Sequence, residues 1–199
     1  MTGLLGRVVS AAQVRDAVRT TLQTWLPAML ADVADQEQCS PLAPIRSWDH
    51  AADVRRLTPD QLPSLIVGCG GTSGRKLRAG GIVDLTWTVD VATVVRGQSY
   101  GDTSDLAARY TAAAAQVLVV VVPQHPLIVE VRIPDTGGET FEVADIGSAR
   151  TLAVGIATVE VTVDGARTLQ PPSAASPSGM PTVPTVQQTE VEVVVDESP

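Results

Sequence analysis

The chain has 199 residues, enough for one large or two small domains with a core that folds without disulfides or metals. Its 22 acidic and 14 basic residues give a formal net charge of -8 at pH 7, which argues against a protein whose affinity comes from gripping nucleic-acid phosphates. The residues are 44% hydrophobic but only 3% aromatic, so aliphatic side chains must fill the core, and we expect a sheet with helices packed on it.

The cysteines and the hydrophobic runs bear on the compartment. Cys39 and Cys69 lie far apart, with neither a metal-ligand spacing nor the density of a disulfide scaffold, so we expect reduced thiols. The start MTGLLGRVVSAAQ lacks the hydrophobic core of a signal peptide, and no run approaches the roughly 18 apolar residues that span a bilayer. We therefore expect a soluble protein with no membrane partner.

The first expected element is a helix. Ser10 and Gln13 have the spacing of a capping box, and apolar residues follow at helical spacing: Val14, Val18, Leu22, Trp25, Leu26, Met29, Leu30 and Val33. Pro27 removes a backbone donor and collides with the carbonyl of Gln23. We expect the helix to kink or restart there and to end near Gln36.

Three strand patterns follow this helix. Residues 45–50 (IRSWDH) indicate a short strand bearing Trp48, and residues 62–68 (LPSLIVG) a second strand with Pro63 near its start. Between residues 82 and 96 apolar and polar side chains alternate. Val83, Leu85, Trp87, Val89, Val91 and Val95 occupy one face, and Asp84, Thr86, Thr88, Asp90 and Arg96 the other. We expect the first face to be buried and the second to be polar.

A second helix is expected over residues 102–120 (DTSDLAARYTAAAAQVLVV). Asp102 and Asp105 lie at its start, and the predicted buried stripe is Leu106, Tyr110, Ala113, Val117 and Val121. Alanines at 112–115 would let this helix lie close to a sheet.

The next strand patterns predict a hairpin and a long strand. Residues 127–133 (LIVEVRI) and 141–146 (FEVADI) flank PDTGGET, a hairpin signal. Residues 151–163 (TLAVGIATVEVTV) indicate another strand, whose apolar positions switch parity around Gly155 and Ile156. We expect a β-bulge at the switch.

The composition divides the chain into one domain over residues 1–169, a linker over 170–188 and an acidic arm over 189–199. The linker, QPPSAASPSGMPTVPTVQQ, is rich in Pro and Ser and cannot build a core. In the arm, Val191, Val193 and Val195 alternate with acidic residues, which indicates a strand that needs an edge to pair with. A disordered acidic tail is the other interpretation.

The stretch GCGGTSGRKLRAGG, residues 68–81, has some features of a phosphate-binding loop. Arg75 stands between Gly74 and Lys76, however, and Leu77 fills the position where a hydroxyl would hold Mg2+. A strand pattern follows, whereas a phosphate loop opens a helix. We interpret the stretch as a flexible connection between strands, whose Arg75, Lys76 and Arg78 contact DNA, an acidic partner or only water.

No catalytic pattern stands out. His50, beside Asp49 and near Asp53, and His125, in the stretch PQHP, lack partners at metal-ligand spacing, and the GxSxG pattern is absent. We expect no catalytic, cofactor-binding or metal-binding residues, and no enzyme.

The order of these elements resembles the tail terminator proteins of long-tailed bacteriophages, especially those of actinobacterial hosts. The segment VDVATVVRGQSYGDTSDLAARYTAAAAQVL carries most of the resemblance, which covers roughly residues 14–163 in element order. The resemblance implies an α+β fold, with an antiparallel β-sheet, packed helices and a kinked N-terminal helix, to which this chain adds an extended C-terminal arm.

The resemblance also implies a function. Tail terminators form a hexameric ring that caps the tail tube, ends its polymerisation and joins the head connector, in the neck of the virion after assembly in the host cytoplasm. DNA passes the lumen without specific binding, and Arg75, Lys76 and Arg78 would face the lumen or a partner. The arm departs from the family pattern, which assigns it no role; from its own sequence we expect the arm, with Val191, Val193 and Val195, to add a strand to a neighbouring virion protein. Alternatives are another neck protein, such as a head-completion or adaptor protein, a tail-tube subunit and, more remotely, a nucleotide-binding enzyme.

Overall fold

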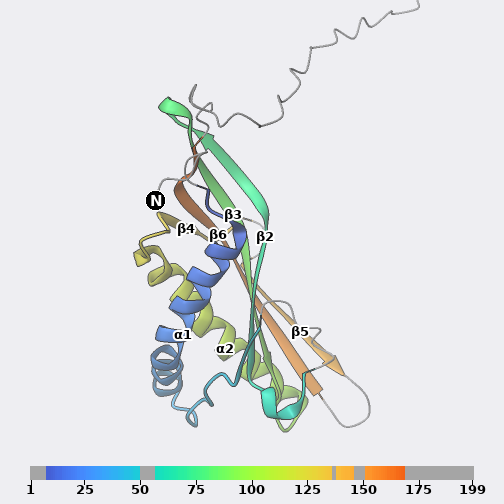
Figure 1. Ribbon diagram of the computed structural model, residues 1–199. Helices are drawn as coiled ribbons and strands as arrows, with labels where there is room; N and C mark the ends of the chain where they lie inside the picture. The colour runs from blue at the N-terminus through green and yellow to red at the C-terminus, as the bar shows by residue number, and fades with distance from the viewer. Residues whose placement is uncertain (1–7, 50–56, 136–137, 146–150, 169–199) are drawn as a thin grey trace, which may run out of the picture.

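The computed structural model describes residues 8–49, 57–135, 138–145 and 151–168 (Figure 1). These residues form a six-stranded sheet with two long helices, α1 and α2, packed against each other and against one face of the sheet. The predicted α+β class is therefore confirmed. The linker and the arm, with Val191, Val193 and Val195, lie outside the described residues.

Helix α1 spans Ala11–Gln36 and ends where the sequence predicts. The capping box is confirmed, because the Gln13 amide donates to Ser10 Oγ and the Ser10 amide donates to Gln13 Oε1. Pro27 lies inside a helix that continues without restarting. Gln23 and Pro27 are both exposed, so water can satisfy the carbonyl that the proline leaves without a donor.

The sheet has the strand order β1-β2-β3-β6-β4, and β5 also pairs with β6. Strands β2 (Ser64–Leu77) and β3 (Ile82–Val95) form a long antiparallel hairpin, and β3 pairs on its other side with β6 (Thr151–Thr168). The short strand β1 (Ser47–Asp49), which bears Trp48 as expected, runs parallel to the start of β2. All other pairings between the described strands are antiparallel, so the predicted antiparallel direction of the strands is wrong only for β1.

The hairpin predicted between residues 127–133 and 141–146 is wrong. Strands β4 (Glu130–Arg132) and β5 (Glu139–Asp145) each pair with β6 and follow one another along its outer edge. Glu130 lies opposite Thr162, and Glu139 opposite Ala157. At 18 residues, β6 is long enough to pair with both strands, so neither needs the other as a partner.

The flexible connection predicted for residues 68–81 is wrong over residues 68–77, because this glycine-rich stretch continues strand β2. Its pairing with β3 shifts register between Cys69 and Thr72 and again between Thr72 and Gly74. Bulges tolerate glycine well, so the glycines allow irregular pairing here and do not interrupt the strand. The turn itself is confined to residues 78–81, where Gly80 and Gly81 have φ values of 78° and 73°.

Strand β6 has no bulge at Gly155. Thr93 lies opposite Gly155 and Ala92 opposite Ile156, in continuous register. The apolar pattern changes parity because a second, smaller cluster covers the other face of the sheet at this end: Leu57, Leu62, Ile66, Val94 and Leu152. The register shift of the β3–β6 pair lies instead between Val83 and Leu85.

Helix α2 spans Tyr100–Val120 and is capped by Ser99, three residues before the predicted start at Asp102. Tyr110, Ala113 and Val117 of the predicted stripe are buried, and Ala107 and Ala114 add to the close contact with the sheet. The segment Tyr100–Gln124 also has the length and mean hydropathy of a membrane span, which a count of consecutive apolar residues does not reveal. Packing on β6 and α1 accounts for part of this apolar character, since Val117 and Leu118 are buried whereas Val119 and Val120 are exposed.

Short 3-10 helices η2 (Pro59–Gln61), η3 (Ala79–Gly81) and η4 (Val122–Gln124) complete the described elements. The hairpin of β2 and β3 extends beyond the two helices, with the end of β6 beside it (Figure 1). The fold therefore presents a helix-covered layer at its centre and a projecting sheet at one end.

Candidate functional site

The three basic residues of the predicted loop occupy different environments. Arg75 and Lys76 lie on β2, opposite Leu85 and Asp84 of β3, so their side chains leave opposite faces of the sheet. Both are exposed, and within the described part of the chain neither forms an ion pair. They are therefore held on a strand, not on a mobile tip, and their charges are available to a partner.

Arg78, in the turn, is committed to an internal network. Its guanidinium Nε donates to Asp84 Oδ2 at 2.6 Å, and its Nη1 lies 3.0 Å from Asp164 Oδ1. The other Asp84 oxygen accepts a hydrogen bond from the Gly165 amide at 2.9 Å. Arg78 thus joins the hairpin turn to the irregular end of β6.

Asp84 differs from the expectation that it lies on a solvated face, because its side chain is only 6% exposed. Burial raises the pKa of the carboxyl, but the hydrogen bonds from the Gly165 amide and Arg78 outweigh burial, and the pKa lies below its ordinary value. Asp84 is therefore ionised at neutral pH. Its hydrogen bonds connect the β2–β3 turn to the end of β6.

The outer edge of β2 is a second notable feature. Strand β1 pairs only with Ser64, Leu65 and Ile66. Beyond Ile66, as far as Leu77, none of the described strands pairs with the outer side of β2. Residues 70–77 are exposed apart from the half-buried Gly74. This row of backbone donors and acceptors is available to another strand.

The face of the sheet away from the helices is polar along its middle. Thr86 and Thr162 share a hydrogen bond of 2.9 Å, and Thr158 donates to Asp90 at 2.7 Å. Thr88 and Glu160 lie opposite each other between these pairs. At the positions of this face on β3 from 86 to 94 and on β6 from 154 to 162, no Lys or Arg occurs.

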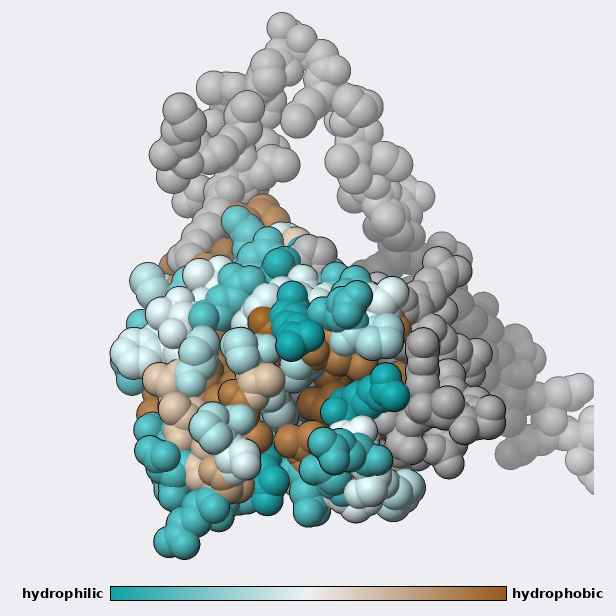
Figure 2. Space-filling view, turned by 90° about the horizontal axis from the view of Figure 1, so that it is seen from below, coloured by the Kyte–Doolittle hydropathy of each residue, from teal (hydrophilic) through white to brown (hydrophobic). Residues whose placement is uncertain are grey.

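A cavity of about 550 Å³ lies at the opposite end of the molecule from the hairpin turn. Figure 2 views this end, where apolar surface lies in a depression framed by hydrophilic residues. The cavity lies between the loop after α1, η2, the end of β3 and the start of α2. Its apolar lining includes Leu42, Leu62, Val95 and Leu106.

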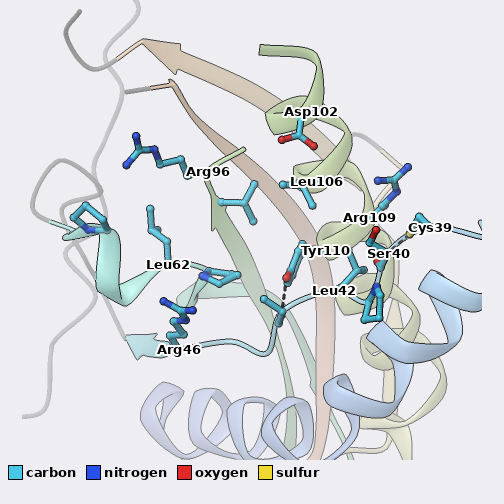
Figure 3. A pocket seen from close by; sticks show the side chains of 15 residues that line it. Cys39, Ser40, Leu42, Arg46, Leu62, Arg96, Asp102, Leu106, Arg109 and Tyr110 are labelled. Atoms are coloured by element: carbon cyan, nitrogen blue, oxygen red, sulfur yellow. Dashed lines mark hydrogen bonds between the residues drawn. The ribbon is translucent and has the colours of Figure 1, made fainter. Parts of the chain in front are cut away.

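Arginines and a tyrosine give the cavity its polar character (Figure 3). Arg109 donates to Glu37 at 2.6 Å, whereas Arg46 and Arg96, both exposed, form no ion pair with any described residue. Tyr110 donates to the Ala43 carbonyl oxygen at 2.6 Å, and burial raises its pKa to about 12, so the phenol stays protonated. Arg46 and Arg96 could contact an anionic group, whereas Asp102, which also lines the cavity, would repel one, and the lining contains no histidine that could act as a base.

The sequence did not reveal this cavity, because its residues come from four separate segments. Arg96 was expected on a polar strand face, and nothing in the sequence singled out Arg46. Leu106 and Tyr110 were expected in the buried stripe of their helix, and Val95 on the buried face of its strand, but that pattern predicts core positions and not a cavity.

The remaining candidate residues within the described ranges form no reactive group. His125 Nδ1 accepts a hydrogen bond from the Leu127 amide, while His50 and Asp53 lie outside the described residues. Cys39 and Cys69 are free thiols, and burial raises the pKa of Cys69. Among the residues that the structure describes, no three His, Cys, Asp or Glu side chains gather as a metal would require.

Comparisons with known proteins add no family. No protein-family model matches the chain, and a search of curated proteins finds no match.

Proposed function

We propose that this chain is the subunit of a hexameric ring. The ring caps a bacteriophage tail tube, ends polymerisation of the tube and provides the joint to the head connector. The observation that carries the proposal is the resemblance of residues 89–118 to tail terminator proteins. This segment forms the second half of β3 and most of α2, the strand and helix at the centre of the fold. The proposed role is structural, in the neck of the virion, with no catalytic residues, cofactor or metal.

The two edges of the sheet support a ring. One edge is the outer side of β2, and the other is formed by β4 and β5 on the far side of β6. The two edges differ, so a contact between them is heterologous and generates a ring when the rotation closes. Edge strands left exposed also tend to be covered by neighbouring chains.

The polar face of the sheet supports passage of DNA through such a ring. Asp90, Glu160 and the four threonines beside them present hydroxyl and carboxylate groups, with no basic side chain among these positions. Phosphates are repelled by carboxylates, and Arg132, which lies opposite Glu160 on the same face, is already paired with Glu130. We propose that this face lines the lumen and that DNA passes it without specific binding.

Native mass spectrometry of the purified full chain, alone and mixed with tail-tube subunits, tests the proposal. We expect a closed species of about six times the chain mass of 20.8 kDa, which joins tube subunits but does not stack by itself. Self-stacking into tubes would identify a tube subunit instead. A monomer that joins neither tube nor connector proteins would overturn the ring.

The same purified protein tests the alternative that the chain is a nucleotide-binding enzyme. Lys76 lies on an exposed strand and not at a helix N-terminus, so we expect no binding of ATP or GTP. Measurable binding by calorimetry that disappears in Lys76→Ala would support an enzyme in place of the structural role.

A further inference from the structure

We propose that the C-terminal arm of one subunit, residues 189–199, adds as a strand to the outer edge of β2, residues 67–77, in a neighbouring subunit. The inference rests on the proposed ring, because it requires a second copy of the chain beside the first. It assigns a partner to the unpaired edge and a binding site to the isolated strand pattern of the arm.

The backbone of β2 is suited to receive a strand. β3 occupies one side of residues 67–77, and the outer side has no partner among the described strands. Gly68, Gly70, Gly71 and Gly74 have no side chain that would hinder the approach of another backbone. Around Gly71 the space is open, since a Cβ there would meet no atom within 4 Å.

Charge makes the edge selective for an acidic strand. Arg75 and Lys76 project from opposite faces of β2, are exposed and form no ion pair with described residues. Basic side chains on an edge normally discourage pairing with another strand. Residues 170–199 contain no Lys or Arg and carry four carboxylate side chains: Glu190, Glu192, Asp196 and Glu197. The arm thus supplies the charge that removes this repulsion.

The place where the described residues end is compatible with an arm that pairs with a neighbouring subunit. Thr168 lies opposite Ile82, the first residue of β3, so β6 ends beside the turn of the β2–β3 hairpin. The outer edge of β2 in the same subunit is two strand spacings from β6, roughly 10 Å. The linker over residues 171–188 spans roughly 50 to 60 Å when extended, far more than folding back requires. The length therefore allows the arm to extend to a neighbouring copy, which pairing within its own subunit would not require.

Cysteine cross-linking in the full chain tests the contact. The two native cysteines are replaced (Cys39→Ser, Cys69→Ser), and Ser73→Cys on the edge is combined with Val194→Cys in the arm. After mild oxidation we expect covalent oligomers on a non-reducing gel. Gln23→Cys with Val194→Cys is the matched control, because Gln23 is exposed on α1 and away from the edge. This control protein should give no covalent oligomers.

Native mass spectrometry of the same samples separates the possible failures. A hexamer whose Ser73→Cys, Val194→Cys variant gives no covalent oligomers would overturn the arm contact and leave the ring intact. Loss of free thiols without covalent oligomers would show that the arm folds back on its own subunit, which also contradicts the inference. A monomer at all concentrations would overturn the ring itself.

Charge reversal tests the selectivity. In the Ser73→Cys, Val194→Cys protein, Arg75→Glu with Lys76→Glu should lower the cross-linked yield about two- to fivefold per reversed charge. Adding Glu190→Lys and Glu192→Lys should restore it. Arg96→Glu, at the opposite end of β3, should leave the yield unchanged. Equal yields in all these proteins would show that charge plays no part.

Discussion

Asp84 connects the β2–β3 turn to the end of β6 through a single carboxylate. Its oxygens accept hydrogen bonds from Arg78 and the Gly165 amide, and the side chain is almost fully excluded from water. A buried carboxylate with such partners stabilises the fold only while it is ionised. The projecting sheet should therefore depend on this residue and on pH.

We predict that Asp84→Asn lowers the free energy of unfolding at pH 7 by about 1–3 kcal/mol, because the amide cannot replace both charge-assisted contacts. The folded pKa of Asp84 lies below its unfolded value, so the contribution is present above about pH 4 and is lost as pH falls through the folded pKa. Urea unfolding of both proteins between pH 7 and pH 3 measures this, and the difference should shrink at the acidic end.

Asp164→Asn is the matched control, because Asp164 contacts the same arginine but is 46% exposed. We expect a loss below about 1 kcal/mol. Equal losses from the two variants, or a difference between wild type and Asp84→Asn that does not change with pH, would contradict the proposed role of Asp84.

Gly155 marks the closest approach of α2 to the sheet. A Cβ at this position would overlap the Thr111 hydroxyl and lie 3.2 Å from the Ala107 carbonyl oxygen. We predict that Gly155→Ala lowers the free energy of unfolding by about 1–3 kcal/mol, because overpacking would force the helix outward. Urea titration monitored by circular dichroism measures the change. Gly71→Ala, on the open edge of β2, should change stability by less than about 0.5 kcal/mol.

At the scale of single elements, α1 shows how burial overrides local propensity. Proline disfavours a helix interior, yet α1 continues through Pro27 because Leu22, Leu26 and Leu30 are buried in the core on either side of it. The proline itself occupies the exposed face, together with Trp25, which is 51% exposed. The apolar face therefore holds the helix together across a backbone defect.

We predict that Pro27→Ala raises the free energy of unfolding by about 1–3 kcal/mol, because alanine restores a backbone donor to the Gln23 carbonyl. Thermal unfolding monitored at a helix-sensitive wavelength measures the shift in Tm. Ala28→Ser, at the next exposed position, controls for a general effect of substitution on this face. A lower Tm for Pro27→Ala would mean that the proline stabilises α1 by restricting the unfolded chain.

At the scale of the whole molecule, we expect the core to provide the stability of the fold and the arm to contribute to assembly. The described residues, of which Thr168 is the last, bury their aliphatic side chains between two helices and one sheet face. We predict that deletion of residues 171–199 leaves the folded core intact but weakens assembly of the ring or neck. Circular dichroism and native mass spectrometry check the two halves of this prediction. Unchanged assembly would contradict it.

Much of the secondary structure was predictable, because alternation and helical spacing report local burial. The capping box at Ser10, the buried face of β3 and the buried positions of α2 follow from residue periodicity alone. Strand pairing was less predictable. The signal around PDTGGET is typical of a hairpin, but β4 and β5 both pair with β6, because pairing depends on which edge the fold makes available.

For the candidate sites too, the sequence predicted the residue types but not which residues would lie together. Arg75 and Lys76 were recognised as exposed basic residues, but the sequence pattern did not show that they lie on an unpaired strand edge. Arg78 is also basic, yet it is neutralised by Asp84, six residues later in the chain, and by Asp164, which lies close to it only in the folded chain. The cavity around Tyr110 was not predicted, since its walls come from segments distant in sequence.

The sequence by itself determined the α+β class, the two helices, the main strands and the acidic balance of the chain, because these depend on composition and short-range periodicity. The tertiary structure alone decided that the glycine-rich stretch is a strand, that β6 pairs with three other strands and that one arginine of the basic group is internally paired. The physical reason is that hydrogen-bond partners and charge partners are chosen by proximity in space, and proximity arises only when the whole core packs.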